Sequence, residues 1–261
     1  PPAILGGLVT LAAPFAYVVV SDGTSVTVGV GTAPGRGRAL AASLGAALGS
    51  APRRQPHPHS SCFPNHVTDL DSSTYSSPLA DRYASRAMLT LWGPATRYGL
   101  WRRLWLALAE SQRSLGLDIP EAALDDMRAH LDDIDFAAVG AYERRFRHDV
   151  MAHVHAFGDV APAARKYIHL GATSCFVTDN AELILMRRGL ALLREKLLDV
   201  LAALDAFARS WKDVPALGYT HLQPAQLTTV GKRATLWMQD ILLDLEDLEY
   251  RIDRLPFRGV K

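Results

Sequence analysis

Apolar residues recur at three- and four-residue steps over residues 98–115, a spacing that places them on one face of a helix. Gly116 follows this segment and is typical of a helix C-cap. A second, shorter helix is predicted over 120–131, where proline stands at the first position, and Asp135 precedes a third that runs toward Tyr142. The apolar positions of the first helix are Leu100, Trp101, Leu104, Trp105, Leu108 and Leu115.

Two longer segments near the end of the chain keep a seven-residue rhythm of apolar side chains. Helices this long, joined by the loop 212–226, bury their apolar faces only against each other or against further long helices. We see no alternating strand pattern after residue 75. The sequence therefore predicts an all-α fold, with an N-terminal helical domain over 75–173 and the first long helices of a central bundle over 174–261. The repeating positions are Leu183, Met186, Leu190, Leu193, Leu197, Leu201 and Leu204, then Ala234, Trp237, Ile241, Leu245, Leu248, Ile252 and Leu255.

Residues 1–74 differ from the rest in composition. Up to Pro64 they contain one acidic residue, Asp22, and no lysine, and they are rich in Ala, Gly, Pro and Ser. The apolar run 3–20 has no basic start and is interrupted by glycine and proline, which disfavours a signal peptide or a membrane span. We expect a low-complexity, disordered extension, or sequence from outside the native coding region. The chain begins without methionine, so we expect the native start to lie elsewhere.

The charge balance gives no reason to expect a nucleic-acid or membrane partner. The 261 residues contain 28 Lys plus Arg against 27 Asp plus Glu, so any anion site is local. The two cysteines, Cys62 and Cys175, stand far apart in unlike contexts and form neither a disulfide framework nor a cysteine zinc site. This usage of cysteine favours a reducing cytoplasm.

The stretch "RRFRHDVMAHVHAFG", residues 144–158, holds three histidines within eight residues. In a continuous helix, His148 and His155 share a face but lie roughly 10 Å apart, and His153 points about 140° away from His148. This spacing disfavours one shared metal ion, although a non-helical loop could gather all three rings. For His153 and His155 the ordinary interpretation is structural, with each ring either exposed to solvent or packed in the core. His148 differs, because Arg147 and Asp149 flank it and could bind an anion and tune the imidazole.

Two further stretches carry candidate chemistry. "IHLGATSCFVTDN", residues 168–180, places Thr173 and Ser174 just before the long helix, where backbone N–H groups and hydroxyls could bind an anion or could form an ordinary helix cap. "GYTHLQPAQLTTVGKR", residues 218–233, places His221 among polar side chains between the two long helices. An imidazole with a pKa near 6.5 is a natural proton carrier at neutral pH.

These segments, with "SPLADRYAS" at 77–85, occur in the order and approximate spacing of the adenylosuccinate lyase family, and the chain resembles that family from about residue 76 onward. The "GYTHLQ.AQ" part also suits argininosuccinate lyases, relatives in the fumarase/aspartase superfamily. The segments "RYAS", "RHDVMAHVH" and "LTTVGKR" favour the purine enzymes. Residues 1–70 take no part in the resemblance.

The resemblance implies a lyase that eliminates fumarate from adenylosuccinate, giving AMP, and from succinylaminoimidazole carboxamide ribotide in purine synthesis. It implies no metal and no organic cofactor, a cytoplasmic homotetramer with shared active sites, and a small nucleotide as substrate. It assigns the general acid to His221. The residues that it assigns to substrate binding are Arg82 and Tyr83 at the phosphate, Arg147, His148 and Asp149, and Thr173 with Ser174 at the succinyl group.

The sequence also departs from the family. The family's general base is a serine on a mobile loop downstream of "FRGVK", where this sequence stops, so we expect these 261 residues to be inactive alone. "TLWGPATRYG", residues 90–99, is locally unlike the family, which leaves the start of that helix open. The alternatives are a member similar to argininosuccinate lyase, a non-catalytic helical assembly protein and, with less support, a histidine metal site.

Overall fold

The computed structural model describes residues 77–260, together with the backbone of 16–21 and 25–30. The chain divides into two compact units, Pro1–Ser85 and Arg86–Lys261, and each is described here by itself. In the first unit, strands β1 (Ala16–Ser21) and β2 (Ser25–Val30) pair antiparallel. These strands lie within residues 1–74, the segment predicted to be a disordered extension. The remainder of that prediction concerns residues outside the described ranges.

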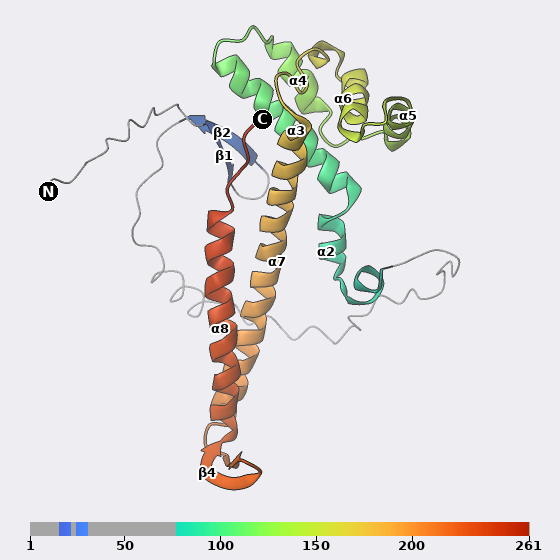
Figure 1. Cartoon of the computed structure of the whole chain (residues 1–261). Helices are drawn as coiled ribbons and strands as arrows, with labels where there is room; N and C mark the ends of the chain where they lie inside the picture. Colours follow the sequence, from blue (N-terminus) through green and yellow to red (C-terminus); the bar gives the residue numbers. More distant parts are fainter. Residues whose placement is uncertain (1–15, 22–24, 31–76, 261) are drawn as a thin grey trace, which may run out of the picture. The chain divides into compact units, whose positions relative to one another are not determined.

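Helices make up most of the second unit, and the predicted all-α class is confirmed (Figure 1). The predicted helix over 98–115 begins earlier, at Pro94, and this is the start that the sequence left open. The structure describes no helix that is long and apolar enough to cross a membrane. In chain order, the first unit adds the helical turn η1 (Leu79–Tyr83), and the second unit contains α2 (Arg86–Leu91), α3 (Pro94–Ser114), α4 (Glu121–Ala129), α5 (Phe136–Phe146), α6 (Asp149–Val160), η2 (Pro162–Ala164), α7 (Ser174–Ser210) and α8 (Val230–Arg254).

Local signals explain where these helices begin and end. The Asp135 side chain accepts hydrogen bonds from two backbone N–H groups in the first turn of α5, as an N-cap does. Gly116 follows α3 with φ of +99°, a conformation that glycine adopts without the strain of a side chain. The predicted end of α3, both ends of α4 and the start of α5 are therefore confirmed to within a few residues.

The core lies where α3 packs on the first turns of α7. Trp105 is fully buried at its centre, and Val177 and Leu185 of α7 are also inaccessible to solvent. Phe157 of α6 stacks on Trp105 with 6.3 Å between ring centroids. Met127 brings α4 into the same core. The apolar face predicted for residues 98–115 thus joins α3, α4, α6 and the first turns of α7 into one packed group of helices, the head.

A buried arginine reinforces the contact between α3 and the turn after α4. Arg102 is only 2% exposed, and it binds the Asp133 carboxylate at 3.0 Å and the backbone carbonyl of His130. Its guanidinium also lies over the Phe157 ring, 4.5 Å from the centroid. Because a buried charge is costly without partners, these contacts make the buried guanidinium of Arg102 tolerable in the core.

The long helices α7 and α8 run side by side, as the heptad pattern predicted (Figure 1). The connection between them is a two-stranded antiparallel hairpin of β3 (Pro215–Thr220) and β4 (Gln223–Thr229), so the prediction of a simple loop here is wrong. Most hairpin side chains are exposed on both faces. Since neither face is buried, the sequence lacks the alternation that marks a half-buried strand.

The chain re-enters α8 through a close approach at Gly231. A Cβ built at this glycine would collide with the backbone oxygen of Ala208 and lie 2.7 Å from the Lys212 Cα. The Gly231 N–H donates to the Trp211 carbonyl at 2.9 Å. Glycine is therefore required here because the two helix ends touch backbone to backbone.

We predict that Leu185→Ala lowers the free energy of unfolding by about 2–5 kcal/mol, since it opens a cavity between α3 and α7. Urea denaturation followed by circular dichroism measures this change. Leu115→Ala is the matched control, because Leu115 is 69% exposed and its loss should change stability by less than about 0.5 kcal/mol. Equal effects of the two substitutions would contradict the assigned core.

Candidate active site

The three clustered histidines occupy three different environments. The chain is not continuously helical here, because α5 ends at Phe146, Arg147 adopts φ of +54° and α6 begins after His148. His153 is buried, with its ring stacked on Tyr98 at 3.9 Å between centroids. His155 stacks on Phe146 at 4.5 Å. Within the described residues no three His, Cys, Asp or Glu side chains are grouped as ligands of one metal ion.

His148 contacts the start of α7. Its Nε2 lies 3.3 Å from the Ser174 Oγ, and its Nδ1 lies 3.4 Å from the Asp149 Oδ1. The same Asp149 oxygen accepts a hydrogen bond from the Val150 N–H at 2.7 Å. Residues from two separate sequence motifs therefore meet, and a carboxylate lies beside an imidazole that reaches a hydroxyl.

This cluster lies where two helices begin. His148 is the N-cap of α6 and Thr173 is the N-cap of α7, and neither side chain satisfies its helix's own N–H groups. The first N–H groups of a helix lack intrahelical partners, and the helix dipole favours negative charge there. Because Thr173 and His148 are exposed, an anion from solvent can reach both helix ends.

His169 belongs to the same region, although no sequence pattern singled it out as a site residue. Burial lowers the pKa of His169, and the charge of His148 lowers it further. Its backbone adopts φ of +65°, a strained conformation for a residue with a side chain. The available signal was its position four residues before Thr173, in a motif already noted for its small and hydroxyl residues.

Arg147 turns the chain between α5 and α6. With Gly140, Glu143 and Arg144 it lines a shallow hollow of about 470 Å³ on the surface of α5. Its side chain is exposed and therefore available to a solute anion. Among the predicted binding residues, Arg147, His148, Asp149, Thr173 and Ser174 thus lie at or beside the two helix starts.

A C-terminal segment fastens the start of α7. The buried Asn180 side chain accepts a hydrogen bond from the Arg258 N–H at 2.8 Å and donates to the Arg258 carbonyl at 3.2 Å. The Thr173 N–H donates to the Val260 carbonyl at 2.9 Å. Residues 258–260 therefore hold the turn that presents Thr173 and Ser174.

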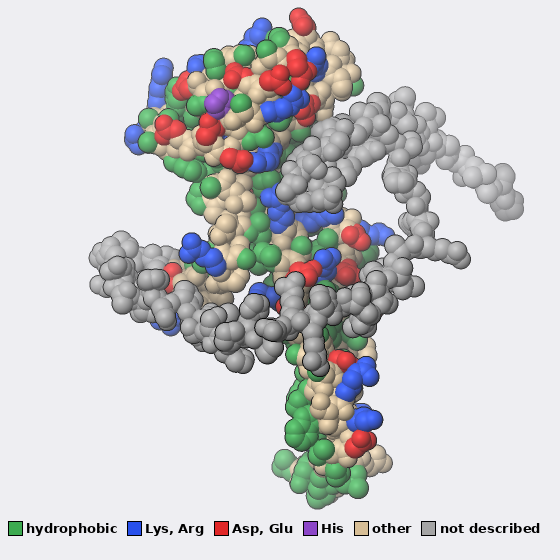
Figure 2. Space-filling model, turned by 180° about the vertical axis from the view of Figure 1, so that it is seen from behind, with side chains coloured by type: hydrophobic (Ala, Val, Ile, Leu, Met, Phe, Trp, Pro, Cys, Tyr) green, Lys and Arg blue, Asp and Glu red, His purple; other side chains and the backbone are tan. Residues whose placement is uncertain are grey.

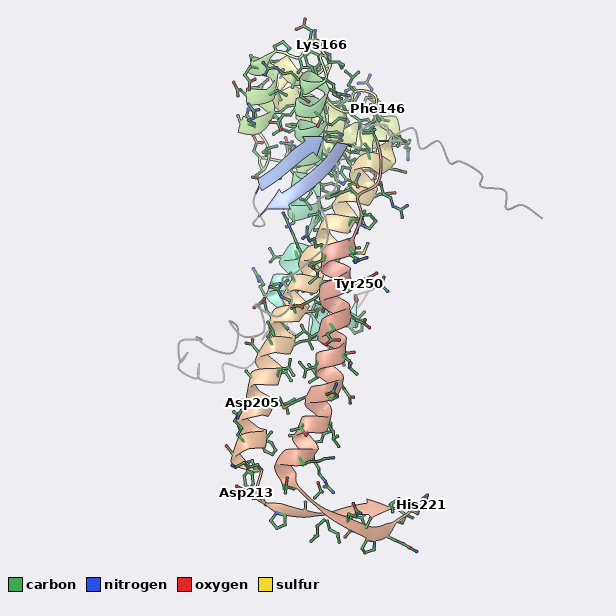
Figure 3. The ribbon with its side chains drawn as sticks, turned by 90° about the vertical axis from the view of Figure 1, so that its left-hand side faces the viewer. Phe146, Lys166, Asp205, Asp213, His221 and Tyr250 are labelled. Atoms are coloured by element: carbon green, nitrogen blue, oxygen red, sulfur yellow. The ribbon has the colours of Figure 1, made fainter. Side chains whose placement is uncertain are left out.

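His221 lies far from this cluster. It occupies the turn between β3 and β4, with φ of +49°, and Figure 3 shows it at the opposite end of α7 from Phe146 and Lys166. The 37 residues of α7 span about 55 Å at 1.5 Å per residue. A single chain therefore does not bring His221 to His148.

Arg82 and Tyr83, the predicted phosphate contacts, lie in the other unit, on η1. Both side chains are exposed, and Tyr83 retains 74% of its accessible surface. They are therefore open to a solute in the unit that contains them.

Comparisons with known proteins agree on a class of enzyme. Residues 105–259 match a family described as "Lyase". The chain is 49% identical over 194 residues to the adenylosuccinate lyases of Saccharomyces cerevisiae and Schizosaccharomyces pombe, covering 73% of this chain and 40% of each relative. It is 47% identical over 188 residues to the adenylosuccinate lyase of Schistosoma mansoni. The chain thus spans about two fifths of the length of these relatives.

Solved structures share the fold of the helical unit. A fumarate lyase from Mesorhizobium sp. BNC1 superposes with a TM-score of 0.57 at 30% identity, covering 63% of this chain and 39% of that one. The 3-carboxy-cis,cis-muconate lactonizing enzyme from Pseudomonas putida gives a TM-score of 0.58 at 25% identity, covering 64% and 40%. The similarity therefore extends from sequence to the arrangement of helices.

The environment of His153 predicts a pH dependence of stability. Burial, and secondarily the Arg102 charge, lower its pKa to about 4, below the ordinary value of 6.5. Between these values the unfolded chain binds a proton that the folded chain does not, so stability falls as pH falls below 6.5. This histidine should remove about 2 kcal/mol of folding stability between pH 7 and pH 5.

His153→Phe keeps an aromatic ring against Tyr98 and should abolish this part of the loss. The measurement is the free energy of unfolding in urea at pH 7 and pH 5 for both proteins. An identical pH dependence of the wild type and the variant would show that His153 is not held neutral by the fold.

Proposed function

This chain belongs to the lyase family, and on that premise we propose that its protein is an adenylosuccinate lyase, which releases fumarate from adenylosuccinate by β-elimination. The observation that carries the proposal is the contact of His148 with Ser174 where α6 and α7 begin. Succinylaminoimidazole carboxamide ribotide is the second substrate in the proposal. The same proposal locates the enzyme in the cytoplasm, in keeping with its sparing use of cysteine.

The helix-start cluster suits the carboxylates of a succinyl group. In the proposed site, Thr173 and Ser174 donate hydroxyl hydrogen bonds to a carboxylate, and the N–H groups of α6 and α7 add favourable partial charge. Arg147 supplies a cation nearby. Holding a carboxylate this way also stabilises the additional negative charge that develops on it when the neighbouring C–H bond loses its proton.

The elimination needs one base and one acid. The base removes a proton from the carbon beside a carboxylate, the electron pair forms the C=C bond of fumarate, and the C–N bond breaks. His221 is proposed as the acid that protonates the departing nitrogen, which leaves AMP. We assign no base among the described residues. Arg82 and Tyr83 are proposed to bind the nucleotide phosphate.

Because α7 separates His221 from His148 in one chain, we propose that each site combines residues of several copies in a homotetramer. The long helices support assembly, since Met186, Leu193, Val200 and Phe207 recur every seven residues on α7 with large exposed fractions. Figure 2 shows hydrophobic side chains gathered along the long helices and at the hairpin end. Exposed apolar surface of this extent is typical of an interface.

Removal of the acid tests the proposed chemistry. In the complete protein, His221→Gln should lower turnover of adenylosuccinate at least about 100-fold, because the departing nitrogen loses its proton donor. The measurement is fumarate release, with the oligomeric state checked by light scattering. Near-normal turnover would remove His221 from this role. Release of fumarate from argininosuccinate in place of adenylosuccinate would reassign the substrate.

Mixed assemblies test the sharing of sites between copies. His221→Gln and His148→Gln should each be inactive alone, whereas co-expression of the two chains should restore fumarate release, because some sites take each residue from an intact copy. His148→Gln co-expressed with Ser174→Ala is the matched control. These two residues touch within one chain, so mixing them should restore nothing. Absence of recovery in the first mixture would contradict shared sites.

A further inference from the structure

Trp105, a tryptophan in the core, holds the imidazole of His169. The Trp105 indole Nε1–H donates a hydrogen bond to His169 Nδ1 at 3.0 Å. Trp105 is fully buried in α3, packed against Phe157 and Trp101, whereas His169 is half-buried on the loop before α7. The bond therefore joins the rigid centre of the core to the strained loop that leads to Thr173 and Ser174.

The chemistry of this bond decides where the imidazole has its proton. An indole Nε1–H is a donor only, so His169 Nδ1 is the acceptor and carries no hydrogen. In a neutral imidazole the proton then lies on Nε2. A second proton on Nδ1 would meet the indole N–H head-on. Trp105 thus selects both the neutral ring and one of its two tautomers.

The surroundings of His169 act in the same direction. Burial and the charge of His148, at the start of α6, both disfavour a protonated ring. On the α3 side His169 meets Trp105, and the neighbouring Gln112 side chain, also neutral, donates to the Leu170 carbonyl at 2.7 Å. Two side chains of α3 therefore hold the loop at His169 and at Leu170, which restricts rotation of the ring.

We propose that Trp105 is a positioning residue that fixes His169 as the neutral tautomer with its proton on Nε2, an N–H donor to the anion bound beside His148 and Ser174. The identity of that anion, a carboxylate or phosphate of the substrate, rests on the proposed function. The protonation state and the tautomer of the His169 ring do not rest on the proposed function. A neutral N–H donor can bind an anion without the long-range charge that would perturb the adjacent His148.

The chain offers a matched control for removal of the indole. Trp101 also lies buried in α3, 3% exposed, and within the described part of the chain its Nε1 has no hydrogen-bond partner. Trp105→Phe and Trp101→Phe therefore remove the same group from the same helix and the same core. Only the first removes a hydrogen bond to an imidazole.

The tautomer is measured directly by magic-angle-spinning NMR of the complete protein labelled with [15N]histidine. The spectrum of His169→Gln identifies the His169 signals by their absence. We expect a protonated Nε2 and a bare Nδ1 in the wild type and in Trp101→Phe, and a mixture of tautomers in Trp105→Phe. A wild-type proton on Nδ1, or an unchanged tautomer in Trp105→Phe, would overturn the proposal. If Trp105→Phe fails to fold, the wild-type spectrum still decides it.

Kinetics with adenylosuccinate give the second readout. Trp105→Phe should raise KM about 3- to 10-fold with a smaller effect on kcat, because one binding hydrogen bond weakens. Its KM should also fall at low pH, since the freed imidazole can gain a proton and bind anions more tightly, and this step should lie below pH 6.5 because burial and the charge of His148 still lower the pKa of His169. The wild type and Trp101→Phe should lack this step in KM. The same step in all three proteins would overturn the proposal.

Replacement of His169 separates the two ring nitrogens. The amide of His169→Gln can place an N–H near the Nε2 position and should bind substrate better than His169→Asn, whose amide reaches only the Nδ1 position. In the His169→Gln background, Trp105→Phe should not alter the pH dependence of KM. If Asn restores binding better than Gln, the proposal fails. A wild type that releases no fumarate contradicts the proposed function, whereas the NMR result still decides the role of Trp105.

Discussion

The packing of α3 on the first turns of α7 is the contact on which the rest of the helical unit depends. Trp105 and Leu185 are completely buried there, and α4 and α6 attach to the same core. This contact fixes the direction in which α7 leaves the head. It also sets the loop before α7, and so the positions of His169 and Ser174. The core and the candidate site are therefore connected through the loop before α7 and the bond from Trp105 to His169.

The histidines show how one residue type acquires separate roles from packing. His153 is held neutral because aromatic rings exclude water from it. His148 remains exposed at a helix start and reaches Ser174. His169 lies between these extremes and accepts a hydrogen bond from the core. Each environment changes the cost of a positive charge, so imidazoles of the same chemistry differ in the protons they hold.

The unequal burial of α7 along its length connects structure to assembly. Its first turns bury Val177 and Ile184 in the head, whereas farther along Leu193 and Val200 are exposed. Where a helix exposes apolar side chains that its neighbours in the chain do not cover, another apolar surface is needed to bury them. The distance between His148 and His221 points the same way, because the proton donor proposed at His221 acts only within hydrogen-bond reach of its substrate.

The sequence by itself determined α3, α4, α5 and the two long helices with most of their ends, because an apolar period, a capping aspartate at 135 and a glycine at 116 act locally. It also located the motifs that contain Ser174 and His221. Only the tertiary structure decided that His148 touches Ser174 while His153 is buried, and that Trp105 binds His169. The hairpin of β3 and β4 was missed because its side chains are exposed on both faces. These features depend on residues distant in sequence, whose meeting no local pattern encodes.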